Sequence, residues 1–356
     1  MSKFSDLAKM VEKEFGGNAK PSEVGSYLDT GFPPLNKIIS GKYDGGFPVG
    51  RISEIYGPES SGKTALATAV MIDAQRKGGI AALNDHERSF SDVLAAHNGL
   101  MVDDEAPWFY QKPKTYEESL EIFLRYVKMV RDNKIIGKDD PICYVFDSLA
   151  SMIQMQQSGR NFTALNINDT TALARVTSTT MKSMALMAQD FNVAVLFLNQ
   201  TRMQPGVMYG DPVTTPGGKS LKFYASVRLA LSSSKMSEGT GDKAFVYGSK
   251  IAARTVKNKI YRPFLKAEWG FRFDENGFGY FDRAGSLLEY AVERGVVEDN
   301  KGWLTWLDGS KYRRNELVAK IETEGLLPEL TSALDSAGVT PETDEEAKRI
   351  AKSSEE

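Results

Sequence analysis

The sequence lacks several features that would place it in a class at once. Cys143 is the single cysteine in 356 residues, which excludes a disulfide framework and favours a reducing compartment. There is no apolar run long enough to span a membrane and no leader-like N-terminus, so we expect a soluble, intracellular, cytoplasmic protein. Basic residues are not in excess either. A net charge of -3 argues, on composition alone, against a nucleic-acid partner, so any DNA affinity must come from local basic groups.

The chain does contain a complete phosphate-binding pattern, G-x-x-x-x-G-K-[ST], at residues 57–64 (GPESSGKT). Residues 51–56 favour a strand before it and residues 65–76 favour a helix after it, which is the context that the motif requires. Glycines let the backbone N–H groups turn inward beside the helix N-terminus, which forms an anion cradle. We therefore expect nucleotide contacts from Gly57, Pro58, Glu59, Ser60, Ser61, Gly62, Lys63 and Thr64. Lys63 should reach the terminal phosphates of ATP, and the Thr64 hydroxyl should ligate Mg²⁺.

Further apolar runs alternate with helical patterns and predict an α/β fold with a mostly parallel sheet. Strands are expected at residues 80–84, 142–146 and 193–198, and a helix at residues 116–131. The Gly-, Pro- and Ser-rich residues 18–50 read as a linker into the first central strand, and residues 232–241 as a polar hinge-like loop. Residues 251–281 read as strands and turns. Helices at 287–295 and 314–324 predict a small α/β appendage, followed from residue 340 by a charged tail.

Polar residues follow these strands and should meet at one edge of the sheet, where parallel sheets bind ligands. Asp147 is placed to hold the water shell of a metal ion next to the phosphate loop. Glu87 is placed to orient and deprotonate an attacking water, although spacing alone does not separate it from Asp85. Gln200, at the next strand end, could detect the γ-phosphate and report it to the following loop.

Two long polar segments are candidate binding loops, because loops of this length inside a compact domain are usually functional or disordered. One runs over residues 201–219 and carries Arg202 and Lys219. The other, residues 151–171, leads into Arg175, Ser178 and Lys182, whose spacings of three and four place them on one helix face. Two cations and a hydroxyl on one face suit a phosphate backbone, while a solvated helix face is the alternative.

Taken together, the motifs resemble the RecA recombinases of bacteria and their phages. The resemblance rests on GPESSGKT, the Asp147-Ser148 strand end, NQTRM (199–203), GVMYGDPVTTPGGKSLKFYASVRL (206–229) and VKNKIYRPF (256–264), and it covers nearly the whole chain. It implies a RecA-type ATPase core that forms an ATP-dependent helical filament on single-stranded DNA. Such a filament pairs its strand with homologous duplex DNA and exchanges strands, with a single-strand-binding protein and a loader as further partners.

The resemblance also implies roles for individual residues. Glu87 resembles the catalytic glutamate and Gln200 the sensor that couples the γ-phosphate to the DNA loops, while Phe223 matches an aromatic that transmits nucleotide state between subunits. Lys257 and Lys259 match a pair that reaches the ATP of a neighbouring subunit. Implied contacts to DNA come from Arg175, Ser178, Lys182, Arg202, Met203, Gly217 and Gly218. The helix predicted at residues 4–15, which the residues alone leave free to dock on either its own core or a neighbour, resembles the family's polymerisation helix.

The implied division places an oligomerisation helix and linker at residues 1–30, the ATPase core at 31–282, a small domain at 283–339 and a flexible tail at 340–356. DNA-binding loops are expected at about 151–174 and 201–219.

Some positions depart from the family. Ser91 and Leu94 stand where an acidic residue and a tyrosine normally contact adenine, which predicts a raised KM for ATP and weaker discrimination against GTP, unless adenine is read elsewhere. Pro205 replaces an aliphatic residue that wedges between base triplets. Ser232 to Ser234 occupy a stretch that is arginine-containing in bacterial members. Such drift is typical of a divergent bacterial or phage-borne member, acting in a bacterial cell or a phage-infected host.

Two other classes share the phosphate loop. Ring-forming DNA helicases have the same sheet, but the lysine pair at 257 and 259 in place of an arginine finger argues against them. A nucleotide-binding mediator that does not hydrolyse ATP is the non-enzyme alternative. The joint presence of Lys63, Glu87, Asp147 and Gln200 argues against it.

Overall fold

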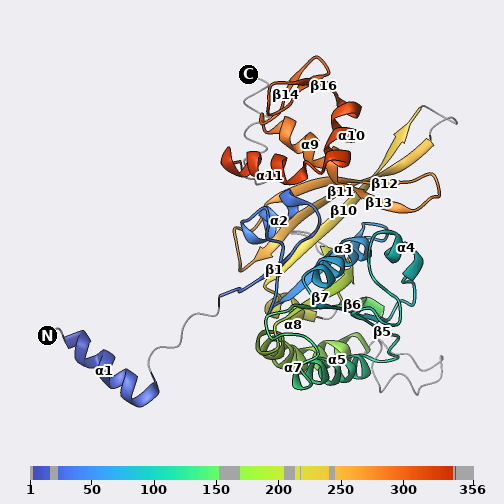
Figure 1. Ribbon diagram of the computed structural model, residues 1–356. Helices are drawn as coiled ribbons and strands as arrows, with labels where there is room; N and C mark the ends of the chain where they lie inside the picture. The colour runs from blue at the N-terminus through green and yellow to red at the C-terminus, as the bar shows by residue number, and fades with distance from the viewer. Residues whose placement is uncertain are drawn as a thin grey trace.

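The computed structural model describes residues 3–16, 23–151, 169–203, 213–216, 218–239, 245–339 and 341, and every structural statement below concerns those residues. The first helix, α1 (Lys3–Phe15), lies apart from the rest of the fold (Figure 1). Its large apolar side chains are exposed, with Phe4 at 79% and Phe15 at 78%. The predicted helix is therefore confirmed, and its apolar face does not pack on its own core.

Within the described ranges, nine strands form the main sheet in the order β13-β12-β11-β10-β3-β7-β6-β4-β5. The strands from β10 to β5 run parallel to one another, whereas β10 to β13 pair in antiparallel fashion. The prediction of a mostly parallel α/β sheet is confirmed. The bounds are β3 (Ile52–Gly57), β4 (Ile80–Asp85), β5 (Trp108–Gln111), β6 (Ile142–Asp147), β7 (Val193–Gln200), β10 (Val227–Glu238), β11 (Phe245–Asn258), β12 (Lys266–Phe273) and β13 (Gly279–Asp282).

Both faces of the parallel strands are covered, which explains why these strands are apolar throughout. Alternate residues point to opposite faces. On one face Val145 and Leu196 join a cluster with α3 (Lys63–Arg76). On the other, Tyr144 and Phe197 pack with α5 (Tyr116–Asp132) and α7 (Asp169–Asp190). Figure 1 shows this layering, with α3 on one side of the parallel strands and α5 and α7 on the other.

The remaining helices and small sheets complete the described fold. Cys143 is fully buried in the sheet, which confirms that it is a core residue. No helix in the described ranges combines the length and apolar character needed to cross a bilayer. The elements not yet given are β1 (Tyr27–Leu28), α2 (Pro33–Ser40), β2 (Phe47–Pro48), α4 (Asp92–His97), the short 3₁₀ helix η1 (Leu149–Ser151), β8 (Arg202–Met203), β9 (Val213–Thr214), α8 (Gly218–Tyr224), α9 (Arg283–Glu293), β14 (Glu298–Asn300), β15 (Trp303–Thr305), β16 (Lys311–Arg313), α10 (Arg314–Glu324) and α11 (Leu327–Ser336).

The linker expected over residues 18–50 is wrong for its described part. Helix α2 buries Leu35, Ile38 and Ile39 completely, so this segment is an ordered part of the core. Proline at the start of α2 and Gly41 at its C-cap, with φ of 80°, set the ends of the helix. The same residues that suggest a linker by composition here serve as helix boundaries.

The hinge-like loop expected at residues 232–241 is also wrong for its described part, because β10 continues to Glu238. Beyond Ala230 this strand pairs with β11 alone, from Leu231 opposite Ala253 to Glu238 opposite Phe245. The side chains at 232–235 are exposed. Backbone hydrogen bonds pair β10 with β11 here and do not depend on the identity of the side chains. The serine-rich composition therefore indicates solvent exposure and does not indicate a loop.

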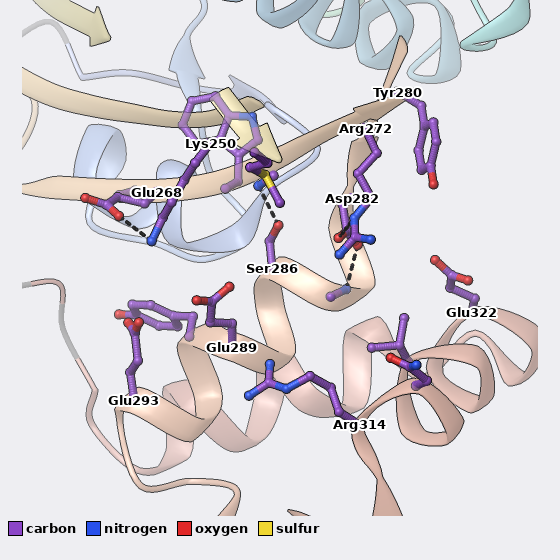
Figure 2. Close-up of a pocket in the computed structure, with 18 of the residues that line it drawn as sticks. Lys250, Glu268, Arg272, Tyr280, Asp282, Ser286, Glu289, Glu293, Arg314 and Glu322 are labelled. Carbon is purple, nitrogen blue, oxygen red and sulfur yellow. Dashed lines mark hydrogen bonds and ion pairs between the residues drawn. The ribbon is translucent and has the colours of Figure 1, made fainter. Parts of the chain in front are cut away.

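The C-terminal elements pack onto the antiparallel half of the main sheet and share one hydrophobic cluster with it. Leu287 and Leu288 of α9 belong to this cluster together with Trp269 of β12. The predicted helices at 287–295 and 314–324 correspond to α9 and α10, whereas α11 was not anticipated. A cavity of about 660 Å³ lies at this seam between β12 and the helices α9 and α10. Figure 2 shows its mixed charge, including the ion pairs Lys250–Glu268 and Arg272–Asp282. The domain boundaries remain a prediction.

Candidate functional site

The phosphate loop joins β3 to α3, as predicted. Gly62 has φ of 85°, and a Cβ there would lie 2.6 Å from Cδ1 of Ile251. At Gly57 a Cβ would lie 2.5 Å from the carbonyl oxygen of Leu231. Both positions therefore require glycine. Inside the loop, Oγ of the buried Ser61 donates to the carbonyl of Pro58 at 2.8 Å, which fixes the curve that opens onto the N-terminus of α3.

Lys63 lies over the mouth of this loop. Its Nζ donates to the carbonyl oxygens of Gly57 at 3.1 Å and Pro58 at 2.7 Å. Burial lowers the pKa of Lys63, while the carboxylates of Asp147, Glu87 and Glu59 act against that shift. Among the described residues, the hydrogen-bond partners of this ammonium group are two neutral carbonyls, which phosphate oxygens can replace.

Thr64 and Asp147 meet beside the loop. Oγ1 of Thr64 donates to Oδ2 of Asp147 at 2.9 Å. Burial, and next the charge of Glu87, raise the pKa of Asp147 to about 7. A hydroxyl and a carboxylate in contact are oxygen ligands of the kind Mg²⁺ prefers. No group of three or more His, Cys, Asp or Glu residues that could hold a metal occurs in the described ranges. The Thr64 hydroxyl and the Asp147 carboxylate fit a Mg²⁺ ion whose remaining ligands would be water and phosphate oxygens.

Three strand ends converge on Glu87. Its Oε1 accepts from Oγ of Ser148 at 2.5 Å and from Nε2 of Gln200 at 3.2 Å. Oγ of Ser151 is a further donor at 3.3 Å. The predicted meeting of Glu87 and Gln200 is thus observed. The serines were not singled out as site residues, and only the position of Ser148 directly after Asp147 at a strand end could have pointed to it.

The geometry also separates Glu87 from Asp85. Asp85 is buried and its carboxylate accepts from the backbone N–H groups of Arg88 at 2.7 Å and Phe90 at 3.2 Å, and from the Tyr110 hydroxyl at 2.8 Å. These bonds shape the turn after β4. Asp85 therefore has a structural role, which leaves Glu87 as the carboxylate that faces the site.

A cavity of about 430 Å³ continues from the phosphate loop along α3. Ser91 and Leu94, which the resemblance predicts to lie near the base, both line this cavity. Ser91 is the N-cap of α4, because its Oγ accepts from the backbone N–H of Leu94 at 3.2 Å. That serine oxygen is thus already engaged in holding a helix end.

The lysine pair lies at the end of β11, against α8 of the same chain. Nζ of Lys257 donates to the carbonyls of Lys222 at 2.6 Å and Phe223 at 2.7 Å, at the C-terminal end of α8. Both Lys257 and Lys259 lie over the Phe223 ring, at 6.0 and 5.6 Å from its centroid. Burial, and then the neighbouring charges of Lys259 and Arg228, lower the pKa of Lys257 to about 8. Phe223 itself is 68% exposed.

The residues predicted to contact DNA are only partly described. Arg202 is exposed on β8, which pairs with β9, and Gly218 begins α8. Arg175, Ser178 and Lys182 lie on α7, so their helical spacing is confirmed, and Lys182 is exposed. The side chains of Arg175, Ser178 and Met203, together with Gly217, Pro205 and most of both predicted loops, lie outside the described residues.

A buried network ties the loop-bearing strands together. Glu54 on β3 is fully buried and accepts from Nε of Arg228 at 2.5 Å and from Nδ2 of Asn199 at 3.0 Å. Asn199 also donates to the carbonyl of Pro216 at 3.1 Å, just before α8. This network was not predicted from the sequence, and it joins the strand that leads into the phosphate loop to the segment that leads into α8.

Comparison with known proteins identifies the family of this chain. A family model described as the RecA N-terminal domain matches residues 13–277. The chain is 34% identical to Protein RecA of Thermus thermophilus over 339 residues, which cover 93% of each protein. It is 33% identical to Protein RecA of Ruminococcus albus over 305 residues, covering 84% of this chain and 70% of the relative. With Protein RecA of Streptococcus pyogenes it shares 31% identity over 362 residues, covering 98% and 89%. The chain therefore belongs to the RecA family of recombinases.

Proposed function

We propose that the strand-end site hydrolyses ATP with Mg²⁺ and that this hydrolysis drives a filament on single-stranded DNA. Membership of the RecA family makes the chain a recombinase of DNA recombination and repair and a DNA-dependent ATPase. The observation that carries the assignment to this site is the convergence of Glu87, Gln200 and Ser148 beside the phosphate loop. It places an oriented carboxylate and a neutral amide next to Lys63, where a terminal phosphate would lie.

Each residue then has a task. Lys63 exchanges its two carbonyl partners for oxygens of the terminal phosphates, and Thr64 and Asp147 hold Mg²⁺ and its water shell. When bound, Mg²⁺ supplies positive charge to the phosphate oxygens. Glu87, fixed by the Ser148 hydroxyl, orients the attacking water and accepts its proton.

Gln200 is suited to report the γ-phosphate to the DNA loops. Its side-chain amide donates to Glu87 and its backbone leads directly into β8, which carries Arg202. A phosphate oxygen that competes for the same N–H would draw Gln200 away from Glu87 and move the start of β8. We assign DNA contacts to Arg202, Lys182, Arg175 and Ser178, on elements that border this path.

Polymerisation follows from two exposed features. The apolar face of α1 is not used by its own core, and it suits a neighbouring subunit. Phe223 and Lys259 are exposed and the half-buried Lys257 lies beside them, and we assign this cationic and aromatic group to the ATP of the next subunit. Completion of the site across an interface explains why hydrolysis would depend on DNA, since DNA aligns the subunits.

The partners we propose are single-stranded DNA, homologous duplex DNA and further copies of this chain, together with a single-strand-binding protein and a loader in the bacterial or phage-infected cytoplasm. Electron microscopy with single-stranded DNA and a non-hydrolysable ATP analogue tests the assembly. A helical filament is expected. Closed rings would favour the helicase class, and the absence of both would favour a mediator. A strand-exchange assay with homologous and heterologous duplex tests the activity, and equal yields with both duplexes would refute it.

A further inference from the structure

The cavity beside α3 is placed to receive the base of a nucleotide whose phosphates lie on the loop. Its walls come from the first turns of α3 (Thr64, Ala65 and Thr68), from α4 and from β13. Its volume of about 430 Å³ is within the range of small-molecule sites. Since Thr64 belongs both to the phosphate loop and to this wall, one ligand can reach both. This reasoning rests on the proposed nucleotide site.

The residues at the start of α4 offer little means of recognising a base by hydrogen bonds. Oγ of Ser91 is already an acceptor for the backbone N–H of Leu94. The Leu94 side chain, 37% exposed, provides only an apolar surface. A serine hydroxyl can donate or accept, so even its remaining capacity does not distinguish a base amine from a base carbonyl.

Asn98, at the other end of α4, has a defined polarity. Its Nδ2 donates to the carbonyl of Leu94 at 3.0 Å and to the carbonyl of Gly279 on β13 at 3.0 Å. A carbonyl oxygen can only accept, so these two partners fix which end of the amide is nitrogen. Within the described ranges, Oδ1 of Asn98 has no hydrogen-bond donor. Asn98 is one of the residues that line the cavity, and with Nδ2 held by two carbonyls its Oδ1 is the side-chain atom left to accept a hydrogen bond.

A second contact holds this end of α4 in place. Nε2 of His97 lies 3.1 Å from Oδ2 of Asp274, and the imidazole stacks on the ring of Phe278 with centroids 4.6 Å apart. Together with the bond from Asn98 to Gly279, these contacts pin α4 to the turn between β12 and β13. The Asn98 amide is therefore held before any ligand arrives, as a specificity group should be.

We propose that Asn98 selects adenine, with Oδ1 accepting a hydrogen bond from the exocyclic 6-amino group. Guanine and hypoxanthine carry a 6-oxo group, which would face the Asn98 oxygen as a second acceptor. Rotation of the amide to present its NH₂ group would sacrifice both bonds to Leu94 and Gly279. Adenine discrimination then comes from the C-terminal end of α4, in place of the weak discrimination expected from Ser91 and Leu94.

Equilibrium binding of nucleoside diphosphates to the full chain without DNA tests the proposal. Calorimetric titration with ADP, IDP and GDP compares the 6-amino group with the 6-oxo group without any mutation. We expect ADP to bind at least about tenfold more tightly than IDP, the usual order of selectivity when a hydrogen-bonding site meets an unmatched group. Equal affinities for ADP and IDP in the wild type would overturn the role of Asn98.

Variants distinguish the acceptor from the packing around it. Asn98→Ala should bring ADP and IDP to the same affinity. His97→Ala is the matched control, because it loosens the same helix end but keeps the acceptor, so all affinities should fall together with the ADP to IDP ratio retained. Loss of that ratio in Ser91→Ala, but not in Asn98→Ala, would reassign the base contact to Ser91 and refute the proposal. Failure of the wild type to bind ADP at all would refute the nucleotide site itself, and the assignment of Asn98 with it.

Discussion

Lys257 provides the sharpest test of a site shared between subunits. In the single subunit its Nζ is bound to the last carbonyls of α8, and its pKa is lowered from the ordinary 10.5 to about 8. Burial is the main cause, followed by the charges of Lys259 and Arg228. If Lys257 reaches the ATP of a neighbour, it must do so as a cation, because the neutral amine has no charge to offer a phosphate.

The expected size of the effect follows from the pKa. A group with a pKa of about 8 is roughly half charged at pH 8 and about one tenth charged at pH 9. Contact with a polyphosphate raises the pKa, so formation of the contact takes up a proton whenever the free subunit has lost it. Because of this proton uptake, the apparent association constant between subunits should fall by up to about tenfold for each pH unit above 8. Well below pH 8 it should not change.

The assay is DNA-stimulated ATP hydrolysis and filament light scattering between pH 7 and pH 10, in wild type and in Lys257→Arg. Arginine stays charged throughout this range, so the ratio of variant to wild-type activity should rise above pH 8 even if the variant is weaker in absolute terms. Lys259→Arg is the matched control, because it leaves the titration of Lys257 in place and should follow the wild-type profile. Parallel profiles for wild type and Lys257→Arg would refute the requirement for a charged Lys257.

Three further predictions follow from the same geometry. Hydrolysis should be weak for the chain alone and stimulated by single-stranded DNA, and Lys63→Ala should abolish it with the circular dichroism spectrum unchanged; equal turnover with and without DNA would contradict the filament. Doping wild type with Lys257→Ala/Lys259→Ala protein should lower activity more steeply than the mutant fraction, whereas a proportional fall would show that each site works alone. Glu54→Gln should lower the free energy of unfolding by about 3 to 5 kcal/mol, because the Arg228 side chain, which is only 11% exposed, loses its charged partner, and a Glu54→Gln/Arg228→Met double variant should recover part of this loss in urea titrations.

The elements that the sequence predicted well are those specified by contiguous residues. The strand, loop and helix around GPESSGKT were predicted because the phosphate loop, its glycines and its flanking periodicities lie within one short segment. The parallel strands were predicted because burial on both faces makes each an uninterrupted apolar run, as in β6 and β7. Their order in the sheet did not follow from these patterns, since pairing depends on partners distant in the chain.

The errors arose where composition and structure point in different directions. Glycine and proline around residues 31–41 mark the ends of a buried helix, and the serines at 232–234 lie on an exposed ribbon. Local composition indicates solvent exposure and backbone freedom. It does not indicate whether a segment pairs with a distant strand or is buried under another element, and these contacts decided the structure of both segments.

By itself, the sequence determined the family, the phosphate loop and the set of polar strand ends, because each is a local pattern of residue types. Spacing alone left Glu87 and Asp85 as alternatives, and only the tertiary structure separated them on physical grounds, since they differ in the partners that other strands bring to them. It likewise decided that Lys257 holds the end of α8 and that Asn98 meets Gly279 from 181 residues away. Such contacts depend on the packing of distant segments, which no local pattern of residues encodes.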